Sequence, residues 1–368
     1  MLTALPSLDE AEITLIGTGG GYGESIVVHL GNNEWAVIDS CIDPFTKESL
    51  PLKYLKDLGV DIKQSVKVVL CTHWHDDHLL GISQLFNEAE SAEFCWAETT
   101  DKKKFLQLVE LDYNKLPKGA SNSSTLEFGA CIEIARSRNT RLKLAKENTT
   151  IWANGTIGAL RSEIISLSPS DKTILNFHAE ISELITEYGP LNKKIVAPSA
   201  NAKSIAIYLK LGAHRAILGA DLEISTDPLE GWHNILDKCH VIDKKASLFK
   251  IPHHGSSNGY LEEVWTKLLE SNPVANLTPW NRNTKLPKIV MLKKFCSHSD
   301  KVYMTKMMES SKPKKRDKKI EKTIKSLGYK ISEVKFLHGI VRCRIKIADP
   351  EDSWKVELFE NAVQVNVI

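Results

Sequence analysis

Three histidines and two aspartates crowd into six consecutive positions of this chain, within the stretch Thr72-His73-Trp74-His75-Asp76-Asp77-His78. The apolar run Val66–Leu70 comes just before them and predicts a buried strand. Imidazoles and carboxylates that converge at the rigid end of a strand make the kind of ligand set that a metal ion requires. His73 and His75 alternate, so both can point the same way, whereas Asp77 and His78 face a slightly different point. The spacing therefore indicates a metal site, with ligands for two adjacent ions, rather than a polar surface loop.

The elements that would position this motif follow from apolar periodicity and turn residues. Apolar runs predict strands both before and after the motif, and segments with helical spacing lie between them. The expected strands are Ile13–Ile16, Ser25–Leu30, Trp35–Ile38, Val66–Leu70, Asn201–Leu209, Ala216–Leu218, Ile340–Ile345 and Trp354–Phe359, and the expected helices are Leu52–Leu58, Leu79–Phe86, His178–Tyr188 and Leu286–Cys296.

Composition limits the class of protein. The chain has 368 residues, 42% of them hydrophobic and 26% charged, which is enough for one large domain or two modest ones with a sizeable core. Its seven cysteines are scattered and never form C-x-x-C, which argues against a disulfide framework or a thiolate zinc site. The first twelve residues do not resemble a signal peptide, and no apolar run approaches the roughly 20 residues of a membrane span. We therefore expect a cytoplasmic protein that does not associate with membranes.

The H-x-H-x-D-H pattern after an apolar strand resembles the signature of the metallo-β-lactamase superfamily. Three further motifs narrow the resemblance to the metallohydrolase domain of the ComEC-type competence proteins and its free-standing relatives: Asn201-x-x-Ser204, Gly219-Ala220-Asp221-Leu222-Glu223 and Pro252-His253-His254-Gly255-Ser256. This resemblance covers most of residues 13–368. It implies an α/β fold, the four-layer αββα sandwich, as a single domain over residues 1–368. An accessory insertion is expected at about 98–150 and a basic insertion at about 306–330.

The resemblance also implies a site. His73 and His75 would bind a first ion, Asp77 and His78 a second, and Asp221 would bridge the two. Either His253 or His254 would complete the second site, and His254, next to the glycine, is favoured. The implied ions are zinc, one or two of them, with manganese as an alternative.

Other side chains would hold the metal-binding loop in place or take part in the reaction. Asp39, after the strand Trp35–Ile38, would brace the metal-binding loop rather than bind metal. Asp77 or Asp76 would orient the attacking water, and His253 would give a proton or a hydrogen bond to the substrate.

The chain departs from the superfamily at Ser168, where a histidine ligand is expected. A serine is a poor ligand for zinc, and His178 or Asp171 lies close enough in sequence to substitute for the missing histidine. If neither does, the first site keeps two histidines and a bridging carboxylate. Such a site would accept manganese or magnesium as well as zinc.

A basic stretch suggests a substrate class. Residues 301–330 carry eleven basic and three acidic side chains, whereas the whole chain has a formal charge of only +2. This stretch is either a solvated segment or a patch that attracts phosphate, and Trp74 would either stack on a base or support packing. The expected nucleic-acid contacts are Lys312, Lys314, Lys315, Arg316, Lys318 and Lys319.

Three functions fit these residues. The first is a metal-dependent phosphodiesterase or nuclease acting on nucleic acid. The second is a hydrolase of a small ester, amide or signalling nucleotide, because one site can serve many substrates. The third is a metal-bearing module of a DNA-uptake or defence complex that is active only with a partner protein.

Overall fold

The structure is a computed structural model, and it describes residues 3–18, 23–99, 104, 124–140, 142–155, 160–188, 200–281, 284–308, 317–329 and 338–365. Two mixed sheets of eight strands form its centre. In spatial order the first sheet contains β15 (Lys355–Glu360), β14 (Gly339–Lys346), β1 (Glu10–Gly17), β2 (Glu24–His29), β3 (Trp35–Ile38), β4 (Val66–Leu70), β5 (Glu93–Ala97) and β6 (Leu142–Ala145). The second contains β16 (Val363–Gln364), β13 (Val302–Met304), β12 (Leu269–Leu277), β11 (Ala246–Lys250), β10 (His214–Leu218), β9 (Ile207–Leu211), β8 (Ser162–Ser166) and β7 (Thr149–Ala153).

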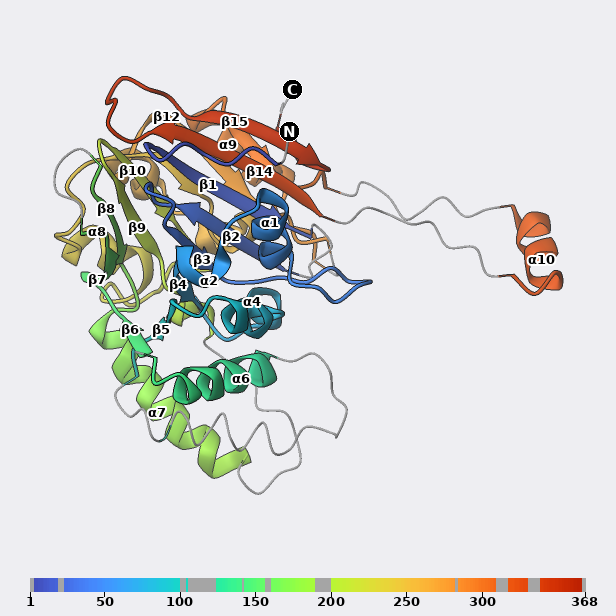
Figure 1. Ribbon diagram of the computed structural model, residues 1–368, viewed down its shortest axis with the longest axis horizontal. Helices are drawn as coiled ribbons and strands as arrows, with labels where there is room; N and C mark the ends of the chain where they lie inside the picture. Colours follow the sequence, from blue (N-terminus) through green and yellow to red (C-terminus); the bar gives the residue numbers. More distant parts are fainter. Residues whose placement is uncertain are drawn as a thin grey trace.

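Helices cover the outer faces of both sheets (Figure 1). The described helices are α1 (Leu50–Leu58), α2 (Ile62–Ser65), α3 (Asp76–Leu79), α4 (Ile82–Glu88), α6 (Ser124–Ser137), α7 (Asp171–Tyr188), α8 (Gly231–Lys238), α9 (Ile289–His298) and α10 (Lys318–Ser326). Within the described part of the chain, no helix is both long enough and apolar enough to cross a membrane.

Three apolar cores separate these layers. Side chains such as Leu15 and Leu209 fill the space between the two sheets. Successive side chains of a strand point to opposite faces of its sheet, and here both faces are buried. A second core packs α1, α4 and α6 on the first sheet through residues such as Leu55 and Phe128. A third packs α8 and α9 on the second sheet, with Trp232 at its centre. The expected αββα sandwich is thereby confirmed.

Each sheet changes from antiparallel to parallel pairing near its middle. In the first sheet β3, β4, β5 and β6 run parallel, and in the second β10, β11, β12 and β13 do. The carboxyl ends of neighbouring parallel strands lie at one edge of a sheet, which is where open α/β sheets collect their functional loops. Polar motifs that follow β3, β4, β10 and β11 are therefore placed to meet at one edge of the sandwich.

Several element boundaries differ from the expected ones for local reasons. The helix expected over Leu79–Phe86 is divided into α3 and α4, because Gly81 takes a left-handed φ of 82° between them. The strand expected over Asn201–Leu209 begins at Ile207, and Asn201–Lys203 is instead a 3-10 turn. The helix expected from His178 begins one to two turns earlier, at Asp171.

The region expected as an accessory insertion contributes to the layers. Within residues 98–150 the structure describes α6, which packs in the core of the first outer layer, and β6, which is an edge strand of the first sheet. Of the region expected as a basic insertion, the structure describes residues 306–308 and 317–329. The extent of the domain, residues 1–368, stays a prediction.

A buried ion pair joins the two sheets close to this edge. Lys250, at the end of β11, is fully buried and pairs with Glu24, the first residue of β2. The Lys250 ammonium also donates to the Ala220 carbonyl oxygen at 2.9 Å and lies 4.0 Å from Oδ1 of Asp221. Buried charges are stable only when they are paired, so Lys250 and Glu24 depend on each other.

Replacing Lys250 with Met should therefore lower the free energy of unfolding by about 3–5 kcal/mol, because Glu24 would become a buried carboxylate without a compensating charge. Urea unfolding measures the change. Lys53→Met is the matched control: Lys53 pairs with Asp57 at 2.7 Å on the surface, and losing such a pair costs less than about 1 kcal/mol. Adding Glu24→Gln to Lys250→Met should recover part of the loss. A double variant no more stable than the single one would contradict the pairing argument.

Candidate metal centre

Loops from four strands bring the predicted ligands together. Asp39 follows β3, the His73–His78 loop follows β4, Asp221 follows β10, and the pair His253 and His254 follows β11. Gly23, just before β2, packs against the same loop: a Cβ atom there would collide with the backbone carbonyl oxygen of Asp77, and its φ is 125°. Glycine is thus required at position 23 for β2 to begin this close to the His73–His78 loop.

Asp39 is the brace of the loop. Its Oδ1 accepts from the backbone N–H of Thr72 at 2.7 Å, and its Oδ2 accepts from the Thr72 hydroxyl at 2.7 Å. Nδ1 of His78 lies 2.7 Å from the same Oδ2. The buried Asp39 carboxylate therefore holds both ends of the loop. Because it binds Nδ1 of His78, the other ring nitrogen, Nε2, points away from Asp39, an arrangement typical of residues that support a metal ligand.

Four side chains form a compact ligand group: Asp77, His78, Asp221 and His254 each offer an atom within 4.8 Å of the others. Nε2 of His78 lies 3.4 Å from Oδ1 of Asp221, and Nε2 of His254 lies 3.4 Å from Oδ2 of Asp77. Nδ1 of His254 lies 2.9 Å from the carbonyl oxygen of Thr278, so that carbonyl fixes the tautomer and leaves Nε2 for a metal.

The chemistry of this group fits a divalent metal ion. Nε2 of His78 and Oδ1 of Asp221 are buried and have no hydrogen-bond partner among the described residues. An orphaned buried acceptor is costly unless a ligand satisfies it. Two imidazoles and two carboxylates suit zinc and manganese better than calcium or magnesium.

His73 and His75 lie beside this group rather than within it. Nε2 of His73 is 3.2 Å from Nδ1 of His75 and 4.0 Å from Oδ2 of Asp221. Nδ1 of His73 lies 2.9 Å from the Thr72 hydroxyl, which orients the ring. His73 therefore lies close to Asp221 of the compact group, and the binding of a second ion by His73 and His75 stays a prediction.

Ser168 occupies the place where a further histidine ligand was expected. Its hydroxyl donates to the Ser204 carbonyl oxygen at 2.6 Å and accepts from the Ala206 N–H at 2.8 Å, so it fastens its loop to the chain before β9. Neither of the suggested substitutes belongs to the compact group in the described chain: Asp171 pairs with the exposed Lys146 at 3.2 Å, and His178 lies on α7.

The two residues proposed for proton handling have different surroundings. Oδ1 of Asp76 accepts from the backbone N–H of Ser124 at 2.8 Å, at the start of α6. Nδ1 of His253 lies 3.1 Å from Oε1 of Glu223 and 3.0 Å from Oδ1 of Asn258, whereas its Nε2 lies 3.3 Å from Nδ2 of Asn201. His253 therefore faces the approach to the site, while His254 faces the ligand group.

A cleft of about 240 Å³ opens onto the ligand group. His75, Asp77, Asp221, His253 and His254 line it, together with Asn201, Trp280, Thr284 and Leu286. The Trp280 ring packs 5.4 Å from the His254 ring. Sequence reasoning did not single out Trp280, Thr284 or Leu286, because no chemistry-bearing neighbour marks the segment after β12.

Electrostatics divides the histidines of the site into two classes. Burial lowers the pKa of His73 well below its ordinary value, and it also lowers the pKa of His75. Burial acts the same way on His78 and His254, but the Asp221 carboxylate and other nearby carboxylates outweigh it and raise both pKa values. Burial alone would raise the pKa of Asp221, yet the charge of His78 holds it well below the usual range.

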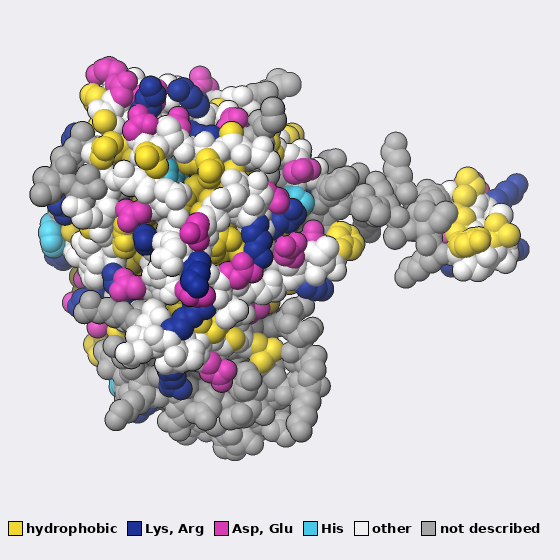
Figure 2. Space-filling view, in the orientation of Figure 1, with side chains coloured by type: hydrophobic (Ala, Val, Ile, Leu, Met, Phe, Trp, Pro, Cys, Tyr) yellow, Lys and Arg dark blue, Asp and Glu magenta, His cyan; other side chains and the backbone are white. Residues whose placement is uncertain are grey.

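The predicted nucleic-acid contacts lie partly outside the described residues, which is the case for Lys312, Lys314, Lys315 and Arg316. Lys318 and Lys319 begin α10, whose residues all lie at least partly in solvent. Figure 2 shows basic and apolar side chains exposed together on this helix, which stands apart from the sheets (Figure 1).

Comparison with known proteins finds a family match for the region that contains the His73–His78 loop. Residues 18–95, which include Asp39 and the His73–His78 loop, match the family model described as "Metallo-beta-lactamase superfamily". No curated protein sequence matches the chain significantly.

Two solved structures show weak likeness. The hydrolase AbOPH in the beta lactamase superfamily is 22% identical over 39% of this chain and 51% of its own, with a TM-score of 0.23. The matched region thus spans about half the length of that hydrolase. A metallo beta lactamase from Hirschia baltica is 10% identical over 60% of this chain and 71% of its own, with a TM-score of 0.28.

The raised pKa values of His78 and His254 predict how metal affinity depends on pH. Both imidazoles keep a proton to a higher pH than a free histidine, whose pKa is about 6.5, and that proton competes with the metal. The affinity for zinc or manganese should therefore rise with pH through neutrality, by up to about tenfold per pH unit for each proton released. Chelator competition from about pH 6 to about pH 9 measures the slope.

The metal-free protein provides the control. The stability that His78 gains from its raised pKa is present below about pH 6.5 and is lost as the pH rises through the raised value. Stability without metal should thus fall over the range in which metal affinity rises. A metal affinity that stays flat over this range would show that the two imidazoles carry no competing protons.

Proposed function

Residues 18–95 match the metallo-beta-lactamase superfamily, and from that match we propose that the chain is a metal-dependent phosphodiesterase that cleaves nucleic acid, close in kind to the ComEC-type metallohydrolases. The observation that carries the proposal is the buried group Asp77, His78, Asp221 and His254 at the mouth of a cleft. When bound there, a divalent ion lowers the pKa of a water molecule from about 15.7 to near 7 and so supplies a nucleophile at neutral pH.

The chain's own residues supply the remaining tasks. Asp77 belongs to the ligand group and also lines the cleft, and it would orient the attacking water. Asp76 was the alternative for this task, but its Oδ1 is engaged by the N–H of Ser124. His253 lines the cleft with Nδ1 held by Glu223 and Asn258. We assign it the proton or hydrogen bond that the leaving oxygen needs, which requires Nε2 of His253 to exchange its contact with the Asn201 amide for one with the substrate.

Nucleic acid is proposed as the substrate because of α10. Its lysines Lys318, Lys319 and Lys322 are exposed on a helix that begins a short way after a further run of basic residues. Such a concentration of positive charge binds phosphate backbones through counterion release. The same metal group would also serve a small ester, amide or signalling nucleotide, or act only with a partner protein in a DNA-uptake or defence complex.

The adjacent histidines provide a matched pair of variants. His254→Ala should lose bound metal together with activity, because it removes a ligand. His253→Ala should keep its metal content and lose about 10²–10⁴-fold in cleavage rate, because it removes only the proton donor. Metal analysis and cleavage of single- and double-stranded DNA and RNA with zinc or manganese measure both effects. Metal-loaded protein that hydrolyses small esters but leaves every polynucleotide intact, alone and with a partner, would refute the proposed substrate.

The basic helix can be tested separately from the metal site. Lys318→Glu with Lys319→Glu should weaken nucleic-acid binding, and it should lower the slope of log affinity against log salt by about one for each phosphate that is no longer neutralised. Lys244→Glu with Lys245→Glu is the control, because these neighbours are also exposed lysines but lie far from α10 in sequence. Equal effects of the two pairs would mean that binding follows net charge and not α10.

A further inference from the structure

Two kinds of residue line the cleft at the ligand group. The proposed function uses the histidines and aspartates among them. The segment after β12 adds Trp280, Thr284 and Leu286, whose side chains carry no charge. An aromatic and an aliphatic side chain beside a polar centre are what binding sites use to hold the apolar part of a ligand. The cleft therefore offers more than a metal site.

Backbone hydrogen bonds hold this segment in place. The N–H of Trp280 donates to the Leu286 carbonyl oxygen at 2.9 Å, and the N–H of Leu286 donates to the Trp280 carbonyl oxygen at 2.9 Å. Residues paired in this way across an antiparallel bridge carry their side chains on the same face. Pro287 packs on the turn after His254, because a Cβ atom at Gly255 would lie only 2.9 Å from Cβ of Pro287. Trp280 and Leu286 are thus fixed as neighbours next to the ligand group.

The indole of Trp280 lies against a ligand and also borders the cleft. Its ring centre is 5.4 Å from that of His254, with an angle of 40° between the two ring planes. The residue is partly exposed and lines the cleft. The cleft volume of about 240 Å³ exceeds the roughly 150 Å³ of a cavity that holds benzene. A flat ring can therefore enter the cleft and stack on Trp280 while a phosphate attached to it faces the ligand group.

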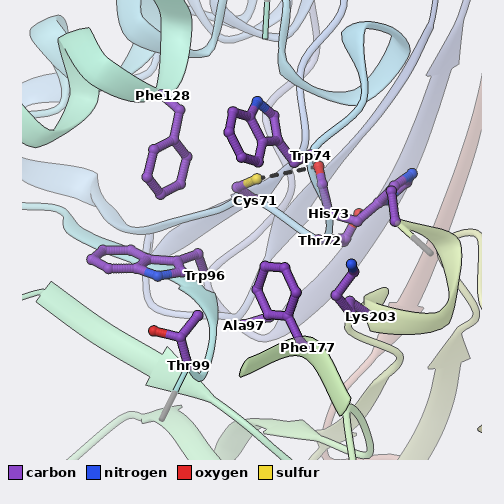
Figure 3. Close-up of a pocket in the computed structure, with 11 residues that line it drawn as sticks. Cys71, Thr72, His73, Trp74, Trp96, Ala97, Thr99, Phe128, Phe177 and Lys203 are labelled. Atoms are coloured by element: carbon purple, nitrogen blue, oxygen red, sulfur yellow. Dashed lines mark hydrogen bonds between the residues drawn. The ribbon is translucent and has the colours of Figure 1, made fainter. Parts of the chain in front are cut away.

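A second group of aromatic rings beside the metal-binding loop does not offer such a place. Trp74, Trp96, Phe128 and Phe177 surround a cavity of about 40 Å³ (Figure 3), which is far below the volume that a ring needs. Trp74 packs against the core of the first outer layer. Of these two aromatic groups, the one at Trp280 can receive a base.

We propose that Trp280 stacks on the base next to the scissile phosphate, and that the site therefore takes single strands. In a duplex both faces of a base are covered by its neighbours. A base can stack on a side chain only where the strand is single or the base is turned out of the helix. Leu286 would contact the same ring beside Trp280. Taking the ring to be a nucleobase rests on the proposed function, and Trp280 is then a residue that determines its specificity.

Equilibrium dialysis of the full chain in the presence of zinc tests this contact without relying on cleavage. The probes are deoxythymidine 5′-monophosphate, deoxyadenosine 5′-monophosphate and, as the ligand without a base, 2-deoxyribose 5-phosphate. Both nucleotides should bind about five- to hundredfold more tightly than the sugar phosphate, because every base has a flat face that can stack.

Variants at position 280 assign that advantage to the indole. Trp280→Leu keeps an apolar side chain against His254 but has no ring, so it should abolish the advantage and leave the affinity for the sugar phosphate unchanged. Trp280→Phe should retain most of the advantage. Trp354→Ala is the control and should bind all three ligands as the unaltered protein does. Trp354 is also a partly exposed tryptophan, but its Nε1 donates to the Ser247 hydroxyl at 3.0 Å and it does not line the cleft.

Any of three binding results would overturn the proposal: nucleotides that bind no more tightly than the sugar phosphate, a full advantage in Trp280→Leu, or an equal loss for all three ligands in a Trp280→Leu protein that keeps its zinc. Cleavage of duplex DNA as fast as single strands would overturn the strand preference. Polynucleotide cleavage without the nucleotide advantage would refute the role of Trp280 alone, and the advantage without cleavage would refute the proposed reaction alone.

Discussion

The metal centre depends on one buried carboxylate that binds no metal in our assignment. Asp39 holds the N–H and the hydroxyl of Thr72 and the ring of His78, each at 2.7 Å. These contacts join the end of β3 to both ends of the loop after β4. The loop carries ligands whose geometry a metal constrains tightly, and its first part, before α3, has no regular structure of its own. The contacts of Asp39 therefore hold this irregular part of the loop at Thr72 and hold α3 at His78.

Concentrating acidic groups in the interior creates an electrostatic problem that the fold solves in two ways. Asp221 and Asp77 are compensated by imidazoles whose pKa values they raise, and these positions are available to metal once the protons leave. Glu24 is instead compensated by Lys250, which also holds the Ala220 carbonyl next to Asp221. The site thus contains imidazole protons that a metal can replace, whereas the ion pair of Glu24 and Lys250 next to it is permanent. That ion pair does not itself depend on a bound metal.

Sequence reasoning found the parts of the site that are local in the chain. The His73–His78 loop, Asp221 and the histidine pair each follow a predicted strand, and those strands form because their apolar patterns are strong. What it could not find depends on distant partners. The contact of Asp76 with Ser124, the fastening of Ser168 to Ser204 and Ala206, and the pairing of Glu24 with Lys250 join segments that no local pattern relates.

Some of these features leave a signal in the local sequence. Lys250 is a charged residue inside the apolar stretch before Pro252, and a charge in a buried strand implies a buried partner. The strand expected from Asn201 failed because Ala200–Lys203 makes a turn first, although the apolar run itself begins only at Ile205. The helix α7 starts at Asp171 and not at the expected His178, and its first residues, after Pro169, are polar. Polar first turns are common in helices, so these residues are compatible with the earlier start.

Backbone conformation, rather than side-chain type, gives His253 and His254 their different surroundings. Both residues have left-handed φ angles, 46° and 52°, and Gly255 follows with 71°. Asp39 and Ala220, at the other strand ends of the site, are left-handed as well, at 59° and 44°. Such conformations cost non-glycine residues on the order of 1–3 kcal/mol each, and the surrounding hydrogen bonds must offset that cost. The tight turn sends two adjacent imidazoles in different directions, one toward Asp77 and the other toward Glu223. An extended conformation at residues 253–254 would also point the two imidazoles in different directions. It would, however, carry the chain beyond the edge of the sheet, so that the His254 ring would no longer reach Asp77 and Asp221.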